Sequence, residues 1–169
     1  MRKPKGVIEV FLQPGELYFG DCHTRIRTLL GSCVSIVLWH REALLGGMCH
    51  YLLPTCRHPG RIADGRYADQ ALHRLLQEIH NSHTRPQDYR ISLFGGGNML
   101  NSPEQHHIGL QNVRAGLALL AAHDLICHSR HVGGKGYRNL IFDVWSGHIA
   151  LRHANAHQIA NRSQEACSP

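Results

Sequence analysis

The strongest constraint on the fold is an almost unbroken apolar run from Cys33 to Trp39, in which Ser35 is the one polar residue. A strand of this composition carries apolar side chains on both faces, so it must be covered on both faces and lie centrally in a sheet. A second apolar segment, Leu44 to Leu52, follows after the polar residues 40–42. The short separation predicts that the two segments are neighbouring strands.

The tripeptide Gly31-Ser32-Cys33 opens this apolar run, and His50 lies seventeen positions after the cysteine (50 − 33) near the end of the next segment. A neighbouring strand can return an imidazole to the side of a thiol, where it can take the proton and supply a reactive thiolate. The alternative is an inert cysteine packed at a strand end. Spacing alone leaves both readings open. If His50 faces a cleft, alternation along the strand turns Cys49 into the core.

Length and composition favour one globular domain. The chain has 169 residues, 43% of them hydrophobic, which is enough for one substantial core. We expect a single domain over residues 1–152 and a polar, loosely held tail over residues 153–169. No apolar stretch approaches the length needed to span a bilayer, and the first six residues lack the apolar segment of a signal peptide. These features predict a cytoplasmic protein without membrane insertion.

The charged residues and the cysteines argue against a nucleic-acid-binding protein, a disulfide-linked protein and a structural zinc site. The formal charge of +6 comes from scattered basic side chains, without the dense basic stripe or interleaved aromatics of a nucleic-acid reader. The six cysteines show no paired spacing, and we expect free thiols. Adjacent pairs such as Cys22 with His23 lack the spacing of a structural zinc site, and adjacent residues of a strand point to opposite faces. The sequence therefore predicts no metal and no cofactor.

Hydrophobic periodicity predicts a layered α/β sandwich with a mixed β-sheet core and at least two amphipathic helices. Helical spacing of apolar residues predicts one helix over 65–80 and another over 108–123, where Ile108, Val113, Leu117 and Leu120 form one stripe. Turns are expected at 13–16 and at 146–147. The predicted strands cover residues 7–12, 17–19, 33–39, 44–52, 89–94, 125–132, 139–144 and 148–151.

Two glycine-rich segments do not match a nucleotide-binding motif. Gly95-Gly96-Gly97 lacks the Lys followed by Ser or Thr of a P-loop and the glycine spacing of a dinucleotide site. We interpret it as a tight strand exit beside the active cleft, with Asn98 orienting a substrate or the loop. The segment 133–136 is interpreted as a flexible loop.

Several blocks of this sequence, taken together and in order, resemble the CheD family of chemoreceptor glutamine deamidases. They extend over residues 16–152, and six blocks in register make a chance similarity improbable. The blocks are Leu30-Gly31-Ser32-Cys33-Val34-Ser35-Ile36, Gly46-Gly47-Met48-Cys49-His50-Tyr51-Leu52-Leu53-Pro54, Arg66-Tyr67-Ala68-Asp69, Phe94-Gly95-Gly96-Gly97-Asn98-Met99, Ile108-Gly109-Leu110-Gln111-Asn112, and Gly133-Gly134 with Phe142-Asp143.

The resemblance implies a cysteine hydrolase that converts selected glutamine side chains of methyl-accepting chemotaxis receptors to glutamate and releases ammonia. It implies Cys33 as the nucleophile and His50 as the general base. The family also uses a threonine shortly before the cysteine, and Thr28 is the nearest candidate. Backbone amides near Gly31, Ser32 and Cys33 would stabilise the oxyanion.

Alternatives remain at this stage. One is a regulatory binding module that engages receptors or a CheC-type phosphatase without needing its thiol. Another is a cysteine hydrolase with a different amide substrate. Because a thioester also forms from a glutamyl methyl ester, esterase activity on the same receptors is conceivable.

Overall fold

The apolar run that follows Cys33 forms strand β4 (Val34–His40), the central strand of a five-stranded sheet. The computed structural model describes residues 2–56, 64–99 and 107–154. Within it β4 pairs antiparallel with β5 (Leu45–Cys49) on one side and with β6 (Arg90–Gly95) on the other. The edges are β2 (Leu17–Gly20), antiparallel to β5, and β7 (Cys127–Val132), parallel to β6.

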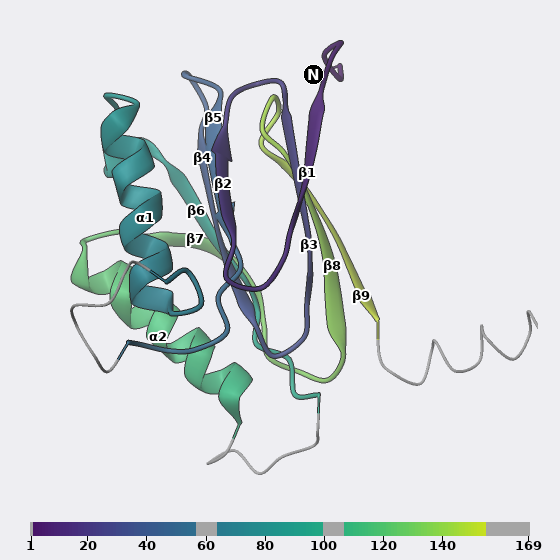
Figure 1. The fold of residues 1–169 in the computed structure, drawn as a ribbon, viewed down its shortest axis with the longest axis vertical. Helices are drawn as coiled ribbons and strands as arrows, with labels where there is room; N and C mark the ends of the chain where they lie inside the picture. Colours follow the sequence, from purple (N-terminus) through teal and green to yellow (C-terminus); the bar gives the residue numbers. More distant parts are fainter. Residues whose placement is uncertain (1, 57–63, 100–106, 155–169) are drawn as a thin grey trace, which may run out of the picture.

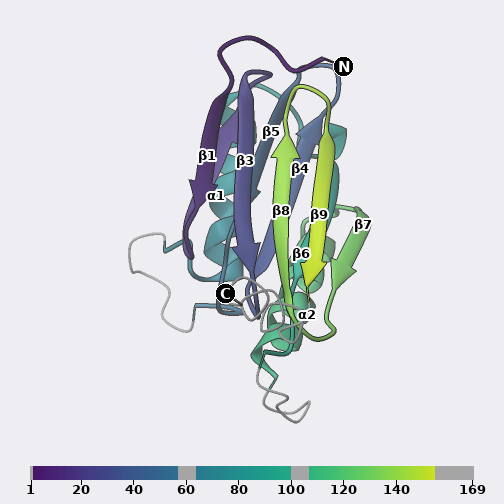
Figure 2. The ribbon, with the colours of Figure 1, turned by 90° about the vertical axis from the view of Figure 1, so that its right-hand side faces the viewer.

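A second sheet of four strands packs against the first (Figure 1). Its order is β1-β3-β8-β9, where β1 and β3 are parallel and the other pairs are antiparallel. Figure 2 looks onto its outer face, and both helices lie behind the two sheets. The strand bounds are β1 (Ile8–Leu12), β3 (Thr24–Leu30), β8 (Tyr137–Asp143) and β9 (His148–Ala154).

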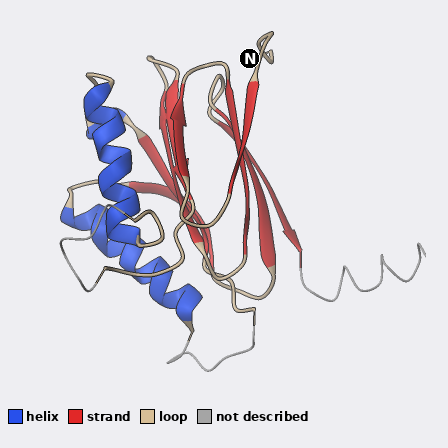
Figure 3. Ribbon diagram, viewed as in Figure 1, coloured by secondary structure: helices blue, strands red, loops and turns tan. Residues whose placement is uncertain are grey.

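Two helices, α1 (Ala68–Asn81) and α2 (Ile108–Ala122), cover the free face of the five-stranded sheet (Figure 3). A short 3-10 helix, η1 (Pro86–Asp88), leads into β6. The resulting layers are helix, sheet and sheet, so the molecule has two apolar cores. The five-stranded sheet separates them, which is why β4 is buried on both faces.

Alternation along β4 assigns its side chains to the two cores. Val34, Ile36 and Leu38 face the helices, whereas Val37 faces the four-stranded sheet. Cys33 packs on the same side as Val37. The start of β4 therefore places the sulfur on the face between the two sheets.

The predicted fold class is confirmed: two helices pack on mixed β-sheets. The helices and most strands lie within a few residues of their predicted bounds, and the turns at 13–16 and 146–147 are present. The core contains two sheets, and the prediction missed one strand, β3. Strand β9 continues to Ala154, so residues 153 and 154 pair with β8. The rest of the predicted tail lies outside the described residues.

The predicted stripe of α2 was wrong at Ile108, which is 37% exposed. The buried face of α2 instead carries Gly109, Asn112 and Gly116 beside Val113 and Leu120. Small residues allow the helix axis to approach the sheet closely, so hydrophobicity alone does not define this face.

Neither helix in the described part of the chain is long and apolar enough to cross a membrane.

Candidate active site

The segment 31–33 is held in place through its carbonyl groups. The Gly31 and Cys33 carbonyls accept hydrogen bonds from Gly97 N (2.8 Å) and Gly96 N (2.8 Å). The carbonyl of Ser32 accepts from the side-chain amide of Asn112 in α2 (3.2 Å). Three consecutive carbonyls are thus held by the glycine turn after β6 and by α2. These hydrogen bonds fix the backbone at Cys33, which lies just before the first residue of β4.

Cys33 and His50 occupy one face of the five-stranded sheet. Val34 and Tyr51 exchange backbone hydrogen bonds of 3.0 and 2.9 Å, so the register of β4 and β5 extends to the site. In this register His50 lies opposite Ser35, and Cys33 is its diagonal neighbour. Such diagonal neighbours lie about 7–8 Å apart in an antiparallel pair, within reach of long or aromatic side chains. The predicted nucleophile and base therefore belong to one local constellation.

The third side chain, Thr28, reaches the site from the opposite sheet. It lies on β3, and its Oγ1 is 2.8 Å from His50 Nδ1 and 3.0 Å from the Leu12 carbonyl oxygen. A hydroxyl has one proton, and the Leu12 carbonyl can only accept, so Thr28 donates to Leu12 and accepts from His50 Nδ1–H. The neutral imidazole then carries its free lone pair on Nε2, the nitrogen a thiol proton can reach.

Burial controls the protonation of both reactive groups. His50 is 3% exposed, and burial lowers its pKa from 6.5 to about 4, although the Leu12 carbonyl and Glu16 oppose this shift. Burial also raises the pKa of the half-buried Cys33 thiol, which its own backbone N–H partly offsets. The resting pair is accordingly a thiol and a neutral imidazole. His50 Nε2 is buried and has no hydrogen-bond partner among the described residues.

The glycine turn after β6 forms the wall behind the nucleophile. Gly95 and Gly96 have φ values of +115° and +68°, and a side chain at Gly95 would overlap the Cys33 carbonyl oxygen. This agrees with the predicted tight strand exit. The backbone N–H of Asn98 donates to the Gly134 carbonyl (2.7 Å), which ties the turn to the 133–136 loop. A substrate-orienting role for Asn98 stays a prediction.

The remaining cysteines differ from Cys33 in their surroundings. Cys49 is fully buried in the core under the helices, where burial raises its pKa to about 12. This is the orientation that alternation predicted from His50. No disulfide joins any of the five cysteines in the described ranges.

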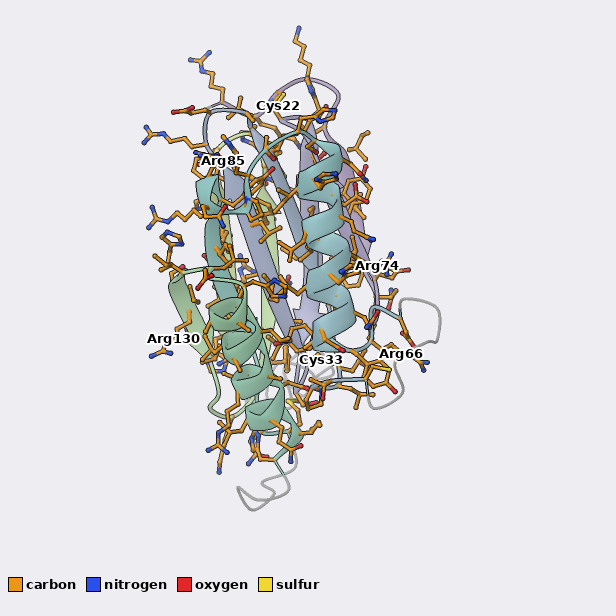
Figure 4. All side chains as sticks on the ribbon, turned by 90° about the vertical axis from the view of Figure 1, so that its left-hand side faces the viewer. Cys22, Cys33, Arg66, Arg74, Arg85 and Arg130 are labelled. Carbon is orange, nitrogen blue, oxygen red and sulfur yellow. The ribbon has the colours of Figure 1, made fainter. Side chains whose placement is uncertain are left out.

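One cluster in the described part has potential metal ligands: Asp21, Cys22 and His23, whose ligand atoms lie within 4.8 Å of one another. The alternation that argued against Cys22 with His23 does not apply, because these residues form a turn. Figure 4 labels Cys22 at the end of the molecule opposite Cys33, so this cluster is separate from the candidate active site.

Sequence reasoning gave no role to two groups that shape the site. The Leu12 carbonyl orients Thr28, and no sequence pattern identifies a backbone oxygen of this kind. Asn112 was part of a recognised block, and a polar residue among small ones on a buried helix face was an available signal. Its amide contacts the carbonyls of Ser32 and Leu52.

Comparison with known proteins shows which proteins this chain is similar to in sequence. Residues 52–153 match the family described as "CheD chemotactic sensory transduction". A protein of Pseudomonas syringae pv. tomato, named "Probable chemoreceptor glutamine deamidase CheD", is 44% identical over 157 residues, covering 90% of this chain and 94% of that protein. A similarly named protein of Dechloromonas aromatica is 50% identical over 151 residues, with 88% and 89% covered. One from Leptospira interrogans is 35% identical over 158 residues, with 87% and 93% covered.

Proposed function

We propose that this chain, which belongs to the CheD family, is a chemoreceptor glutamine deamidase that uses Cys33 as its nucleophile. The hydrogen bond from His50 Nδ1 to Thr28 is the observation that supports Cys33 as nucleophile and His50 as base. It leaves Nε2 free on the sheet face that Cys33 occupies. The proposed substrates are glutamine side chains of methyl-accepting chemotaxis receptors.

The first half of the reaction forms a thioester. As Cys33 Sγ attacks the carboxamide carbon, its proton passes to His50 Nε2 and the carbonyl electron pair moves onto oxygen. The backbone N–H groups of Ser32 and Cys33 donate to no other backbone group in the described chain, so they are available to this oxyanion. The His50 imidazolium then protonates the nitrogen, the C–N bond breaks, and ammonia leaves.

Water completes the reaction. His50 Nε2 takes a proton from a water molecule, whose oxygen attacks the thioester carbon. The C–S bond breaks, the sulfur recovers a proton from the imidazolium, and glutamate remains on the receptor. Thr28 keeps the ring oriented in both halves, since its Oγ1 holds Nδ1 whichever state Nε2 is in.

The proposal is tested by incubating a receptor cytoplasmic fragment with the protein and following ammonia release and the mass of each receptor peptide. We expect peptides that contain specific glutamines to show the mass change that accompanies conversion of an amide to an acid. Cys33→Ala should abolish it, and Cys22→Ala, which removes a cysteine at the far end of the molecule, should not. Equal conversion by wild type and Cys33→Ala would refute Cys33 as the nucleophile.

A CheC-type phosphatase is a further proposed partner. The side chain of Met99, which is 44% exposed, lies beside Gly31 of the nucleophile segment and offers an apolar contact for a protein surface. Pull-down with the phosphatase and with the receptor fragment tests both interactions. If the protein binds either partner equally well before and after alkylation of Cys33 and the receptor peptides never change in mass, the binding-module alternative replaces the enzyme. Because the proposed substrates are the cytoplasmic parts of receptors, we propose that the protein acts in the cytoplasm.

A further inference from the structure

Asn112 lies on the buried face of α2, directly behind the nucleophile segment. Its side chain is completely buried, and Nδ2 donates to two carbonyl oxygens, those of Leu52 (2.7 Å) and Ser32 (3.2 Å). Both amide protons are therefore used, which fixes the orientation of the group. Its Oδ1 has no hydrogen-bond partner among the described residues. The two hydrogen bonds that the amide donates hold it in place. They connect it to the two chain segments that meet beside Cys33.

The contact with Ser32 sets the direction of a second group. In a trans peptide the C=O and the following N–H point in opposite directions. The Ser32 carbonyl points toward α2, so the Cys33 N–H points to the opposite face of the sheet. That is the face on which the Cys33 side chain packs. The same N–H lies close enough to the sulfur to lower the pKa of the thiol.

We propose that Asn112 is a positioning residue that holds the Ser32 carbonyl toward α2 and so aims the Cys33 N–H at the oxyanion. This inference rests on the proposed function in one respect, that Cys33 attacks a carbonyl carbon. In that step the S–C bond forms, the thiol proton goes to His50 Nε2, and the negative oxygen accepts a hydrogen bond from the Cys33 N–H. Asn112 touches neither the sulfur nor the substrate.

The test compares two reactions of the same sulfur. Acylation by p-nitrophenyl acetate passes through a tetrahedral oxyanion, whereas alkylation by iodoacetamide displaces iodide at a saturated carbon and forms none. Both rates are measured at Cys33, with Cys33→Ala supplying the background from the other cysteines. Asn112→Ala removes the donor, and Asn112→Asp keeps the shape but presents a carboxylate to two carbonyl oxygens. Asn81→Asp, at the exposed end of α1, is the matched control.

We expect the acylation rate of both Asn112 variants to fall about tenfold to a hundredfold, because the oxyanion donor is misplaced and not removed, with alkylation changed less than about twofold. On receptor substrate, kcat should fall while KM is retained. Unchanged acylation overturns the proposal. A parallel loss of acylation and alkylation, including loss through unfolding seen in a thermal melt, also overturns it, because Asn112 would then serve the fold alone.

The small ester separates this inference from the proposed function. A wild-type protein that is acylated at Cys33 but leaves receptor glutamines unchanged would refute the receptor substrate and keep the role of Asn112 testable. Receptor deamidation at wild-type rate by both Asn112 variants would refute the role of Asn112 alone.

Discussion

His50 is neutral at rest because burial outweighs the Leu12 carbonyl and Glu16, the two groups that favour an imidazolium. Its Nδ1 faces the Thr28 hydroxyl, and Nε2 lies in a buried position on the face between the sheets. Burial therefore lowers its pKa to about 4. A base of this kind does not hold a thiolate permanently. It accepts the proton of Cys33 during attack, when the developing oxyanion has its own donors.

The lowered pKa of His50 predicts how stability varies with pH. The unfolded chain binds a proton at His50 near pH 6.5, whereas the folded chain resists it down to about pH 4. The unfolded state thus binds more protons between these values, and the free energy of unfolding falls as pH decreases through this window. His50 should contribute up to about 3 kcal/mol to that fall. Urea unfolding of wild type and His50→Asn at a series of pH values measures it, and identical pH slopes would contradict the prediction.

Thr28 is predicted to act through its hydroxyl rather than its shape. Thr28→Val preserves the volume but removes the acceptor for His50 Nδ1 and the donor to Leu12. Misorienting the ring should lower kcat by about tenfold to a hundredfold. Thr28→Ser keeps the oxygen and should retain most of the activity in the receptor assay. A valine variant as active as the serine variant would show that the hydroxyl does not orient the base.

At the scale of elements, α2 combines close packing with a polar contact. Gly116 faces Tyr51, whose hydroxyl donates a hydrogen bond to the backbone carbonyl of Asn112 (2.8 Å). Both the helix backbone and the Asn112 side chain are thereby joined to the strand segments that carry the site. A larger residue at this interface would move α2 and, with it, the amide behind Cys33.

Gly116→Ala separates helix propensity from packing. Propensity alone predicts that alanine stabilises a helix interior by about 1 kcal/mol. The added methyl group, however, would overlap the Tyr51 hydroxyl, and overpacking typically costs about 1–3 kcal/mol. We expect a net loss of stability in urea unfolding. The double variant with Tyr51→Phe removes the overlapping oxygen, so Gly116→Ala should cost less in that background; equal costs in both would exclude this clash as the cause.

Local sequence patterns predicted the helices and strands that have a distinctive composition. They could not predict which side chains of different elements contact one another. The nearly continuous apolar run of β4 indicates a buried strand, and the apolar residues of α1 repeat at helical spacing. In β3 the inward side chains are Thr24, Ile26, Thr28 and Leu30, and Leu29 faces outward. Inward threonines and an outward leucine blur the alternation, so the strand was missed. The pairing of Thr28 with His50 joins two sheets, and no periodicity encodes it.

At the scale of the whole molecule, the site depends on the two sheets staying together. His50 belongs to one sheet and Thr28 to the other. Trp39 Nε1 donates across the sandwich to the Val144 carbonyl (2.8 Å), and the buried Arg138 of β8 donates to His131 of β7 (2.9 Å) and to the Gly133 carbonyl. The five-stranded sheet is also the floor of the core under the helices, so we expect both cores to unfold in one transition.

If both cores unfold in one transition, a substitution that destabilises one core should also increase the exposure of a buried residue in the other core. Phe142 lies between the sheets over Gly46, and Cys49 lies under the helices. Phe142→Ala should cost about 3–5 kcal/mol of unfolding free energy, which corresponds to more than about a hundredfold in the unfolded population. Where labelling follows that population, alkylation of Cys49, measured by peptide mapping, should accelerate by the same factor. Ile126→Ala, which truncates a 72% exposed side chain, is the control and should leave the rate unchanged. Unchanged Cys49 labelling in a destabilised Phe142→Ala protein would mean that the two cores open independently.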